Sequence, residues 1–386
     1  MKKLLYISPF WPVKSGISEY SESLIWGLEK YFEITILVNG YKLENKKITK
    51  HFPIINYESE MVLAGYDVLL YNFGNNPDAH EFMYELMDKY PGYVIMHDVS
   101  LFYLTVDYYA KKGILYQKVY EMEGAKGIRY IKDSLKQNPE PNLLLHKDLA
   151  ANVRMNAEVL RKAKGVFVHS EYAAGQIENV IAKEKICKIN LVENKIETEL
   201  KKDFLKKRFG IKNSEKIIGA AGFIAPSKQN EISCQAVKEY NCTHKEKIHY
   251  VMIGEGDYVD SYLDEYIHKT GFLDNEDFYD ALSSCDVILN LRYPYNGESS
   301  ATLIQSMSIG KPCIVTDIGW FSELPNDSIK KVKKDIKAKH LAEIIEGLVM
   351  DSQSISRKGC DFVKEQCAAE NIAKVVKKFV AKVERW

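Results

Sequence analysis

The residues with the most specific chemistry in this sequence lie in the run RYPYNGESSAT, which begins at Arg292. The run joins a predicted buried strand, 287–291, to a predicted helix, and either Ser299 or Ser300 can cap that helix. The free N–H groups of the helix would then point at an anionic ligand, while Arg292 adds planar donors for phosphate oxygens. Glu298 would repel phosphate alone, but it can accept hydrogen bonds from sugar hydroxyl groups. The combination indicates a sugar nucleotide as ligand, and a purely structural capping loop is the alternative.

Three further features can bind an anion or a sugar. The loop from Pro9 to Gly16 leads from a strand into a helix, and its glycine lets backbone N–H groups approach an anion closely. His97 and Asp98 directly follow a predicted strand, where doubly wound proteins bind ligands. His97 can donate a hydrogen bond or transfer a proton, and Asp98 can orient it or cap the next helix. Lys228, after a strand ending in glycine, can neutralise phosphate. Each feature has a structural alternative: a glycine turn, a satisfied histidine and a solvated lysine.

Several common nucleotide-binding patterns are absent from the sequence. There is no DxD pair to hold a metal–diphosphate, no GxxxxGK[ST] loop, and no GxGxxG followed by an acidic residue. The glycine-dense run Gly254-Glu-Gly256 lacks that spacing and is interpreted as a turn. We therefore expect positive side chains and helix N-termini to take the place of a metal ion. The expected site contains no metal and no cofactor other than the nucleotide-sugar co-substrate.

The bulk composition bounds the class of protein. A chain of 386 residues exceeds what one hydrophobic core normally serves, so we expect two domains. Basic and acidic residues both number 53, and this balance gives no support for a nucleic-acid partner. The seven cysteines are dispersed, with no CxxC pair, which suits reduced thiols in a cytoplasmic protein. They are Cys187, Cys234, Cys242, Cys285, Cys313, Cys360 and Cys367.

The N-terminus has two lysines before an apolar run, as a signal peptide does. Pro9 and Pro12 interrupt that run before any cleavage site, so a buried first strand is the better interpretation. No stretch approaches the roughly 18 apolar residues that span a bilayer. We expect a cytoplasmic location, with contact at the inner face of the membrane left open.

Strand and helix patterns alternate through most of the sequence, which predicts an α/β fold with doubly wound parallel sheets. In the first half the predicted strands are Leu4–Ser8, Ile34–Val38, Val68–Tyr71, Val94–Met96 and Val166–His169. The predicted helices there are Ser18–Lys30, Ala79–Lys89, Lys147–Lys162 and Glu171–Val180. The residues between Leu101 and Asn138 contain no strand and hold six tyrosines among several lysines. This segment is either a helical insertion or an element that binds the acceptor or a membrane surface.

The alternation restarts after the charged stretch Glu197–Lys207, so a domain boundary is expected near residues 200–212. The predicted strands of the second half are Ile217–Ala221, His249–Ile253, Val287–Leu291 and Cys313–Thr316. Its predicted helices are Asn230–Tyr240, Asp257–Ile267, Asp277–Ser284, Ser300–Ile309 and Ala338–Val349. We assign residues 1–205 to a first Rossmann-like domain and 206–367 to a second. The amphipathic tail, 368–386, must pack on another part of the molecule.

The N-terminal half resembles the family-4 retaining glycosyltransferases, which have the GT-B fold. The run 9–20, ending in GISEY, is similar to the family's glycine loop, which lies beside the donor phosphates. His97-Asp98 is similar to the histidine that lines the donor-sugar pocket. The run VFVHSEY, 166–172, resembles the "HS" strand end that closes the family's N-terminal domain.

The resemblance continues through the C-terminal half and covers nearly the whole chain. Lys228 lies where the family has its phosphate-binding lysine, and Gly271-Phe272-Leu273 resembles the segment that borders the nucleotide base. The run 297–325 is similar to the donor-binding signature helix and the strand after it. This resemblance implies that His97 and Glu298 are catalytic. It implies that the donor-binding residues are Gly16, Lys228, Phe272, Leu273, Arg292, Gly297, Ser299, Ser300 and Thr302.

Two departures from the family pattern affect the predicted site. The family has two glutamates separated by seven residues, whereas here Glu298 is followed after six residues by the neutral Gln305. The ribose contact of the second glutamate is therefore in doubt. The basic residue that often accompanies the phosphate lysine is absent near Phe223, and Arg292 can supply that charge. The pattern is that of a subgroup with an RxPxxGExS loop.

The resemblance implies a retaining, metal-independent glycosyltransferase of the GT-B fold, with a cleft between its two domains. The expected partners are a nucleotide-sugar donor (UDP- or GDP-sugar) on the second domain and an acceptor on the first. The acceptor is a glycan, a lipid-linked sugar or a protein, with peripheral membrane contact left open and no nucleic acid expected. The tail helix is expected to cross back to the first domain. The alternatives are a nucleotide-sugar epimerase, a sugar phosphorylase, or a non-catalytic subunit that binds a sugar nucleotide or glycan.

Overall fold

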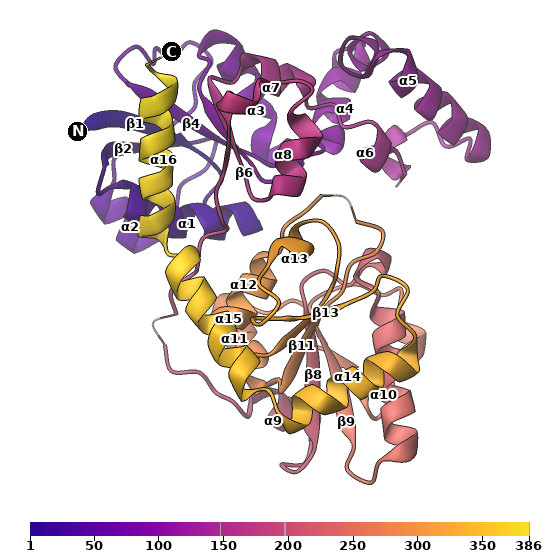
Figure 1. Ribbon diagram of the computed structural model, residues 1–386. Helices are drawn as coiled ribbons and strands as arrows, with labels where there is room; N and C mark the ends of the chain where they lie inside the picture. The colour runs from indigo at the N-terminus through magenta and orange to yellow at the C-terminus, as the bar shows by residue number, and fades with distance from the viewer. Residues whose placement is uncertain (147, 197, 296, 386) are drawn as a thin grey trace. The chain divides into compact units, whose positions relative to one another are not determined.

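A computed structural model describes residues 1–146, 148–196, 198–295 and 297–385 (Figure 1). The chain divides into two compact units, each built around one sheet. The first unit comprises Met1–Asn194, residues 297–299 of the loop before α12, and the C-terminal segment Ala368–Trp386, of which residue 386 is not described. The second comprises Lys195–Tyr295 and Ser300–Cys367.

The first unit contains a seven-stranded parallel sheet in the order β3-β2-β1-β4-β5-β6-β7. The order reverses at β1, which pairs with β2 on one side and β4 on the other. In such sheets, ligands bind outside the carboxyl ends of the strands near this reversal. The strands are β1 (Lys2–Ile7), β2 (Phe32–Val38), β3 (Ile54–Asn56), β4 (Val68–Phe73), β5 (Tyr93–Met96), β6 (Gly165–Val168) and β7 (Ile186–Lys188).

Helices on both faces of this sheet cover the apolar side chains of its strands (Figure 1). The helices of the first unit are α1 (Gly16–Leu28), α2 (Lys46–His51), α3 (Pro77–Lys89), α4 (Phe102–Lys111), α5 (Leu115–Gln137), α6 (Leu149–Asn152), α7 (Ala157–Lys162), α8 (Glu171–Ile177) and α16 (Ala369–Val383). Two short 3-10 turns, η1 (Leu143–Leu145) and η2 (Lys183–Lys185), complete the unit.

The C-terminal helix α16 packs against α1 and the sheet of the first unit (Figure 1). A Cβ on Gly27 would lie 2.2 Å from the carbonyl oxygen of Ala369, so only glycine permits this approach. The ring of Phe379 contacts the rings of Tyr93 and Phe167 edge-on, with centroids 6.5 and 5.0 Å apart. Burial of such an aromatic side chain stabilises the fold by about 1.5–3 kcal/mol.

The second unit contains a six-stranded parallel sheet in the order β10-β9-β8-β11-β12-β13. Its strands are β8 (Lys216–Ala221), β9 (Ile248–Ile253), β10 (Ile267–Lys269), β11 (Val287–Asn290), β12 (Cys313–Thr316) and β13 (Lys330–Val332). Its helices are α9 (Phe204–Phe209), α10 (Asn230–Thr243), α11 (Asn275–Ser284), α12 (Ala301–Ser308), α13 (Trp320–Glu323), α14 (Ala338–Met350) and α15 (Gln353–Gln366), with 3-10 turns η3 (Pro226–Lys228) and η4 (Asp260–Tyr262).

Two predicted helices are wrong in the structure. Residues 257–267 form only the short turn η4 before β10, because Asp260, Asp264 and the backbone satisfy one another in tight turns. The predicted helix Lys147–Lys162 begins at a residue outside the described part of the chain and is otherwise two short helices, α6 and α7. Between them Met155 adopts a positive φ of 54°, which no helix accommodates.

The segment 101–138 is helical, as one of the two sequence interpretations predicts. It forms α4 and α5, and α5 is interrupted at Gly124, which has φ 65° and ψ −163°. With η1 and α6, these helices enclose a small core of their own that includes Phe102, Val119 and Ile131. Tyr116 and Tyr120 remain exposed on α5.

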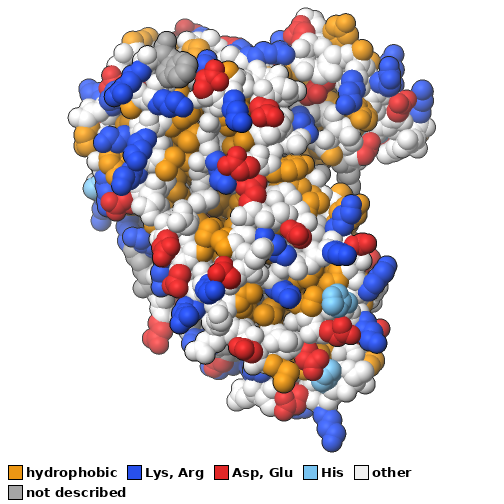
Figure 2. Space-filling model, viewed as in Figure 1, with side chains coloured by type: hydrophobic (Ala, Val, Ile, Leu, Met, Phe, Trp, Pro, Cys, Tyr) orange, Lys and Arg blue, Asp and Glu red, His pale blue; other side chains and the backbone are white. Residues whose placement is uncertain are grey.

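The α/β architecture predicted from the sequence is confirmed, with two Rossmann-like units that each contain a parallel sheet. All seven cysteines are free thiols. On the face shown in Figure 2, positive and negative side chains are interspersed. None of the helices in the described ranges is both long and apolar enough to cross a membrane.

Candidate functional site

In the second unit, the N-terminus of α12 is exposed to a ligand at the carboxyl end of β11. Ser300 is the capping residue, since its Oγ accepts from the backbone N–H of Leu303 at 3.3 Å. Asn290 at the end of β11 donates through Nδ2 to Ser300 Oγ at 3.1 Å and to Thr302 Oγ1 at 3.2 Å. These bonds fix the first turn of the helix, whose N-terminal dipole favours an anion.

Lys228, in the turn η3 that follows the neighbouring strand β8, lies near this helix terminus. Its Nζ donates to the carbonyl oxygen of Ala221 at 3.0 Å, which holds the ammonium group over the end of β8. A Cβ on Gly222 would lie 2.5 Å from that Nζ and 3.9 Å from the methyl group of Thr302. The structure therefore brings together the predicted residues Lys228, Ser300 and Thr302. We name this cluster, with Gly222 and Asn290, the lysine edge.

The run Gly254-Glu-Gly256 supports the lysine edge from behind. A Cβ on Gly254 would lie 2.3 Å from the carbonyl oxygen of Gly222, and one on Gly256 would lie 2.2 Å from that of Ile224. The backbone N–H of Ile224 donates to the Glu255 carbonyl at 2.6 Å. The sequence analysis interpreted this run as a turn and missed its role in holding the Gly222 loop.

Arg292 lies inside the second unit and is only 6% exposed. Its Nη1 donates to the carbonyl oxygen of Leu291 at 2.8 Å, and its guanidinium carbon lies 5.8 Å from the ring centroid of Phe321. Its backbone N–H donates to Thr316 Oγ1 at 2.9 Å. Lys228 is less buried than Arg292, so the lysine is the more accessible cation at this edge.

The predicted base-binding residues follow the edge strand β10. Gly271 has a φ of 73°, and the chain turns there so that Phe272 is 53% exposed and Leu273 half-buried. Phe223, which follows β8 and so also lies at the carboxyl ends of the strands, is 77% exposed. The sequence analysis noted Phe223 only as a place without a basic residue. Two exposed aromatic rings at one edge offer flat apolar surfaces for a base or a sugar.

Gln305 is buried on α12, with 5% exposure. Its side chain therefore presents almost no surface to a ribose. Residues 297–299 group with the first unit, where a Cβ on Gly297 would lie 3.6 Å from the Tyr172 ring and 3.7 Å from Val99. The structure thus assigns Gly297, Glu298 and Ser299 to a different unit from Lys228.

In the first unit, Gly16 begins α1. Ser15 caps the helix by accepting from the backbone N–H of Ile17 at 3.1 Å. A Cβ on Gly16 would meet nothing within 4 Å, so no packing contact inside the protein requires a glycine at this position. The open space suits an approaching ligand, which is the role predicted for Gly16.

His97 lies at the carboxyl end of β5 in a chain of hydrogen-bonding groups. Its Nδ1 is 3.2 Å from Nε2 of His169, and its Nε2 is 3.2 Å from Oδ1 of Asn72. His169 Nδ1 lies 3.2 Å from the carbonyl oxygen of Ile189. The Tyr20 ring contacts His97 edge-on at 4.6 Å between centroids. We name His97, His169, Asn72 and Tyr20 the histidine edge.

The carbonyl of Ile189 fixes the proton of His169. It can only accept, so Nδ1 of His169 carries the proton and its Nε2 is an acceptor. His97 therefore faces two acceptors, His169 Nε2 and Asn72 Oδ1, and its neutral ring has one N–H to donate to one of them at a time. Burial lowers the pKa of His97 well below its ordinary value, and the neighbouring His169 and His80 lower it further. Burial also lowers the pKa of His169 to about 4. At neutral pH, His97 is therefore neutral and carries one ring proton.

Asp98 performs neither of the two roles predicted for it. Its Oδ2 accepts from the backbone N–H of Asn75 at 3.1 Å, while the ring nitrogens of His97 have other partners. The N–H of Leu104 in the first turn of α4 is satisfied by Oδ1 of Asn75 instead. Burial raises the pKa of Asp98 to about 6, the Asn75 N–H lowers it, and the charge of Glu298 raises it again.

The sequence analysis missed three members of the two edges. Asn290 is the last residue of the buried strand β11, and Asn72 is the last but one of the buried strand β4. A polar residue at the end of an otherwise apolar strand could have been predicted as a site residue. Tyr20 is buried, yet its hydroxyl finds no partner among the residues that the structure describes. His169 was noted only as a strand end, although it directly contacts His97.

Together, the fold and the two edges define an α/β protein of the GT-B class, and solved structures of that class are similar over the whole chain. Sucrose-phosphate synthase (tll1590) from Thermosynechococcus elongatus has a TM-score of 0.66 at 13% identity and covers 100% of both chains. Anabaena Alr3699/HepE, in complex with UDP and glucose, has a TM-score of 0.62 at 13% identity, covering 99% of this chain and 100% of its own. WaaG, a glycosyltransferase involved in lipopolysaccharide biosynthesis, has a TM-score of 0.60 at 10% identity, covering 98% and 99%. At these identities, the likeness shows the shared fold.

Residues 215–351 match the family model of the glycosyl transferases group 1. This part of the chain is similar to the group 1 glycosyltransferases, and the enzyme class predicted from the sequence, a glycosyltransferase, is confirmed. The matched residues contain Lys228, Phe272, Arg292 and the whole of α12. A comparison with curated protein sequences finds no match.

Proposed function

We propose that this enzyme is a retaining, metal-independent glycosyltransferase that moves a sugar from a UDP- or GDP-sugar to a glycan, lipid-linked or protein acceptor. The observation that carries the proposal is the lysine edge. There, the Lys228 ammonium group and the capped N-terminus of α12 converge at the ends of two neighbouring strands. A diphosphate is the leaving group that suits one cation and a helix N-terminus. The HepE complex with UDP and glucose supports a uridine nucleotide as the first donor to test.

In this proposal, the lysine edge stabilises the negative charge that develops on the departing diphosphate. Each well-placed donor of this kind contributes about 3–4 kcal/mol to transition-state stabilisation. Phe272 and Leu273 border the nucleotide base, and Glu298 accepts hydrogen bonds from sugar hydroxyl groups. Arg292 contributes indirectly, because its buried side chain and its backbone N–H hold the backbone of the loop that follows β11.

In this proposal, His97 lines the donor-sugar pocket, as the family resemblance implies. His169 and Asn72 occupy its two ring nitrogens in the structure, which orients the ring. A ring held in this way suits a role in shaping the sugar site better than a role as a mobile proton carrier. Gly16 gives the acceptor or the donor phosphates close access to the start of α1. We place the enzyme in the cytoplasm, in the synthesis of a polysaccharide, with its acceptor at the inner face of the membrane.

A thermal-shift screen with UDP-, GDP- and ADP-sugars tests donor binding, and hydrolysis assays on the hits test turnover. We expect a UDP- or GDP-sugar to raise the Tm and to be hydrolysed slowly in the presence of EDTA. NMR of the released or transferred sugar reports whether the anomeric configuration is retained.

The same assays separate the proposal from other activities of this fold. Release of sugar phosphate that depends on inorganic phosphate would identify a phosphorylase, and an altered sugar on an intact nucleotide would identify an epimerase. Donor binding without turnover on any acceptor pool would identify a non-catalytic subunit. Loss of all activity in EDTA, with recovery on Mg²⁺ or Mn²⁺, would contradict metal independence.

A further inference from the structure

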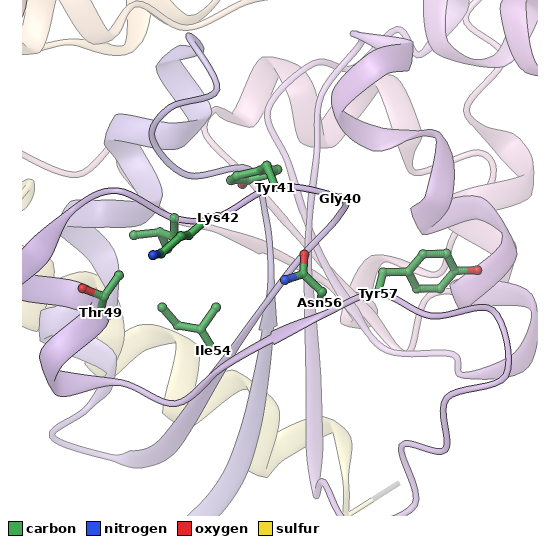
Figure 3. Close-up of a pocket in the computed structure, with 8 residues that line it drawn as sticks. Gly40, Tyr41, Lys42, Thr49, Ile54, Asn56 and Tyr57 are labelled. Carbon is green, nitrogen blue, oxygen red and sulfur yellow. The ribbon is translucent and has the colours of Figure 1, made fainter.

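A pocket of about 520 Å³ opens in the first unit at the carboxyl ends of β2 and β3 (Figure 3). Pockets that bind small ligands have volumes of roughly 300–1,000 Å³, with mostly apolar walls and a few polar groups. Figure 3 shows Tyr41 above the pocket, Lys42, Thr49 and Ile54 together on one side, and Asn56 between them and Tyr57. Leu43 and Gly40 complete its lining.

The wall that carries Tyr41 is fixed to the loop between β1 and α1. The Tyr41 hydroxyl accepts from the backbone N–H of Phe10 at 2.8 Å, and the backbone N–H of Glu44 donates to the Trp11 carbonyl at 3.1 Å. Asn45 donates through Nδ2 to Glu22 on α1 at 2.8 Å. An aromatic ring held in this way binds ligands with little loss of conformational freedom. It also connects the pocket to the loop that contains Gly16.

The polar groups of the lining are available to a ligand. The Asn56 amide and the Lys42 ammonium group have no hydrogen-bond partner within the described parts of the chain, and both side chains are exposed. Thr49 Oγ1 has only a long contact, 3.4 Å, to the carbonyl of Lys46. An aromatic face, an amide and a hydroxyl group match the apolar faces and hydroxyl groups of a sugar ring.

The segment 42–51, which supplies part of the pocket lining, is positively charged, although the whole chain has a net charge of zero. Four lysines and one glutamate lie between residues 42 and 51, and no carboxylate is among the lining residues. His51, at the end of α2, is paired with Glu29 at 2.6 Å. A site of this kind favours a ligand with a single anionic group, since one lining cation is too few for a diphosphate.

We propose that this pocket binds an anionic sugar unit of the acceptor, one that carries a carboxylate or a phosphate group. Tyr41 stacks on the sugar ring, Asn56 and Thr49 bond its hydroxyl groups, and Lys42 pairs with the anion. The inference rests on the proposed function, because only a glycosyltransferase needs an acceptor there. It names the acceptor's chemical class, which the sequence leaves open.

Binding of single sugars to the full-length ²H,¹⁵N-labelled enzyme tests the site directly. Glucuronic acid and glucose 6-phosphate are the anionic probes, and glucose is the neutral one. We expect both anionic probes to shift the amide signals of residues 40–43 and 56–57 at concentrations several-fold lower than glucose requires. A response to only one anionic probe decides between a carboxylate and a phosphate.

Lys42→Ala should weaken the anionic probes about threefold and leave glucose unchanged, as expected for one exposed ion pair. Lys50→Ala, on the same basic segment but outside the lining, is the matched control and should change neither. Asn56→Ala should weaken all three probes. An equal effect of Lys42→Ala and Lys50→Ala, or no signal shifts at residues 40–57 up to about 50 mM probe, would overturn the proposal.

Donor hydrolysis measured without acceptor separates this inference from the proposed function. Lys42→Ala and Asn56→Ala should hydrolyse the donor at the wild-type rate, while transfer to an anionic acceptor shows a raised KM. If the wild-type enzyme binds the probes but neither binds nor hydrolyses any nucleotide sugar, the proposed function fails and the pocket remains a sugar site. If it hydrolyses a donor and binds no probe, the pocket assignment fails alone.

Discussion

The histidine edge and the lysine edge both lie at the carboxyl ends of parallel strands but are built in opposite ways. In the histidine edge, side chains contact one another, with His97 between His169 and Asn72. In the lysine edge, internal bonds hold the scaffold, and the N–H groups of the first turn of α12 are left to face a ligand. The first arrangement fixes a shape, and the second supplies charge. Substitutions should therefore affect structure and protonation at one edge and catalysis at the other.

The largest effect is expected at Lys228. Lys228→Ala removes the accessible cation of the lysine edge and should lower the transfer rate by about 10²–10³-fold, with an unchanged Tm. Lys339→Ala, an exposed lysine of α14, is the control and should keep the wild-type rate. Steady-state kinetics and a thermal melt check both. A wild-type rate in Lys228→Ala would remove this residue from the site.

Glu298→Ala should also reduce transfer strongly, by about tenfold to a hundredfold, because the donor sugar loses a charged hydrogen-bond acceptor. Glu298→Gln keeps a carbonyl acceptor and should retain more activity than the alanine variant. Comparing kcat/KM of the two variants checks the role of the carboxylate. Equal activity of both variants and the wild type would contradict it.

His169→Phe tests whether His169 holds the His97 ring in its orientation. The variant keeps an aromatic ring but leaves Nδ1 of His97 without its imidazole partner, which should cost about 1–3 kcal/mol of unfolding free energy. We expect transfer to fall about tenfold through kcat, since the orientation of His97 is lost. Long-range ¹H–¹⁵N NMR should show a larger share of the Nε2–H tautomer of His97 in the variant than in the wild type, because Asn72 Oδ1 remains as an acceptor for that proton. His169→Gln, which offers an oxygen acceptor, should restore part of both.

The smallest effect is a pH dependence at Asp98. Its pKa of about 6 in the folded protein lies above the value of 3.8 for a free side chain, so the fold disfavours the carboxylate. The resulting penalty is absent below about pH 4, grows as the pH rises through 6, and is then constant at about 1–3 kcal/mol. Asp98→Asn keeps an oxygen for the Asn75 N–H and removes the charge. It should match the wild-type stability at pH 4 and exceed it at pH 8 in urea melts.

The sequence predicted the long, uniformly apolar strands because burial on both faces leaves a continuous pattern. It missed β3, β7, β10 and β13, which are three residues each and too short to show a period. It predicted Lys228 and Ser300 from residue type and local order. It could not predict that Asn75, not Asp98, serves the first turn of α4, because that depends on where two loops meet. The need for glycine at 254 and 256 also arises only from the approach of another loop.

The position of α16 has a consequence for the order in which the protein forms during synthesis. The contact between Lys30 and Glu370 joins residues 340 positions apart, and Gly27 meets the first residue of the helix. Ribosomes deliver the chain from its N-terminus, so every residue of the second unit emerges before α16 does. The first unit is therefore the first to start emerging and the last to receive all of its residues. Until then, the surfaces of α1, Tyr93 and Phe167 that α16 covers stay exposed, and a nascent chain stopped before residue 369 should be the form most readily captured by chaperones.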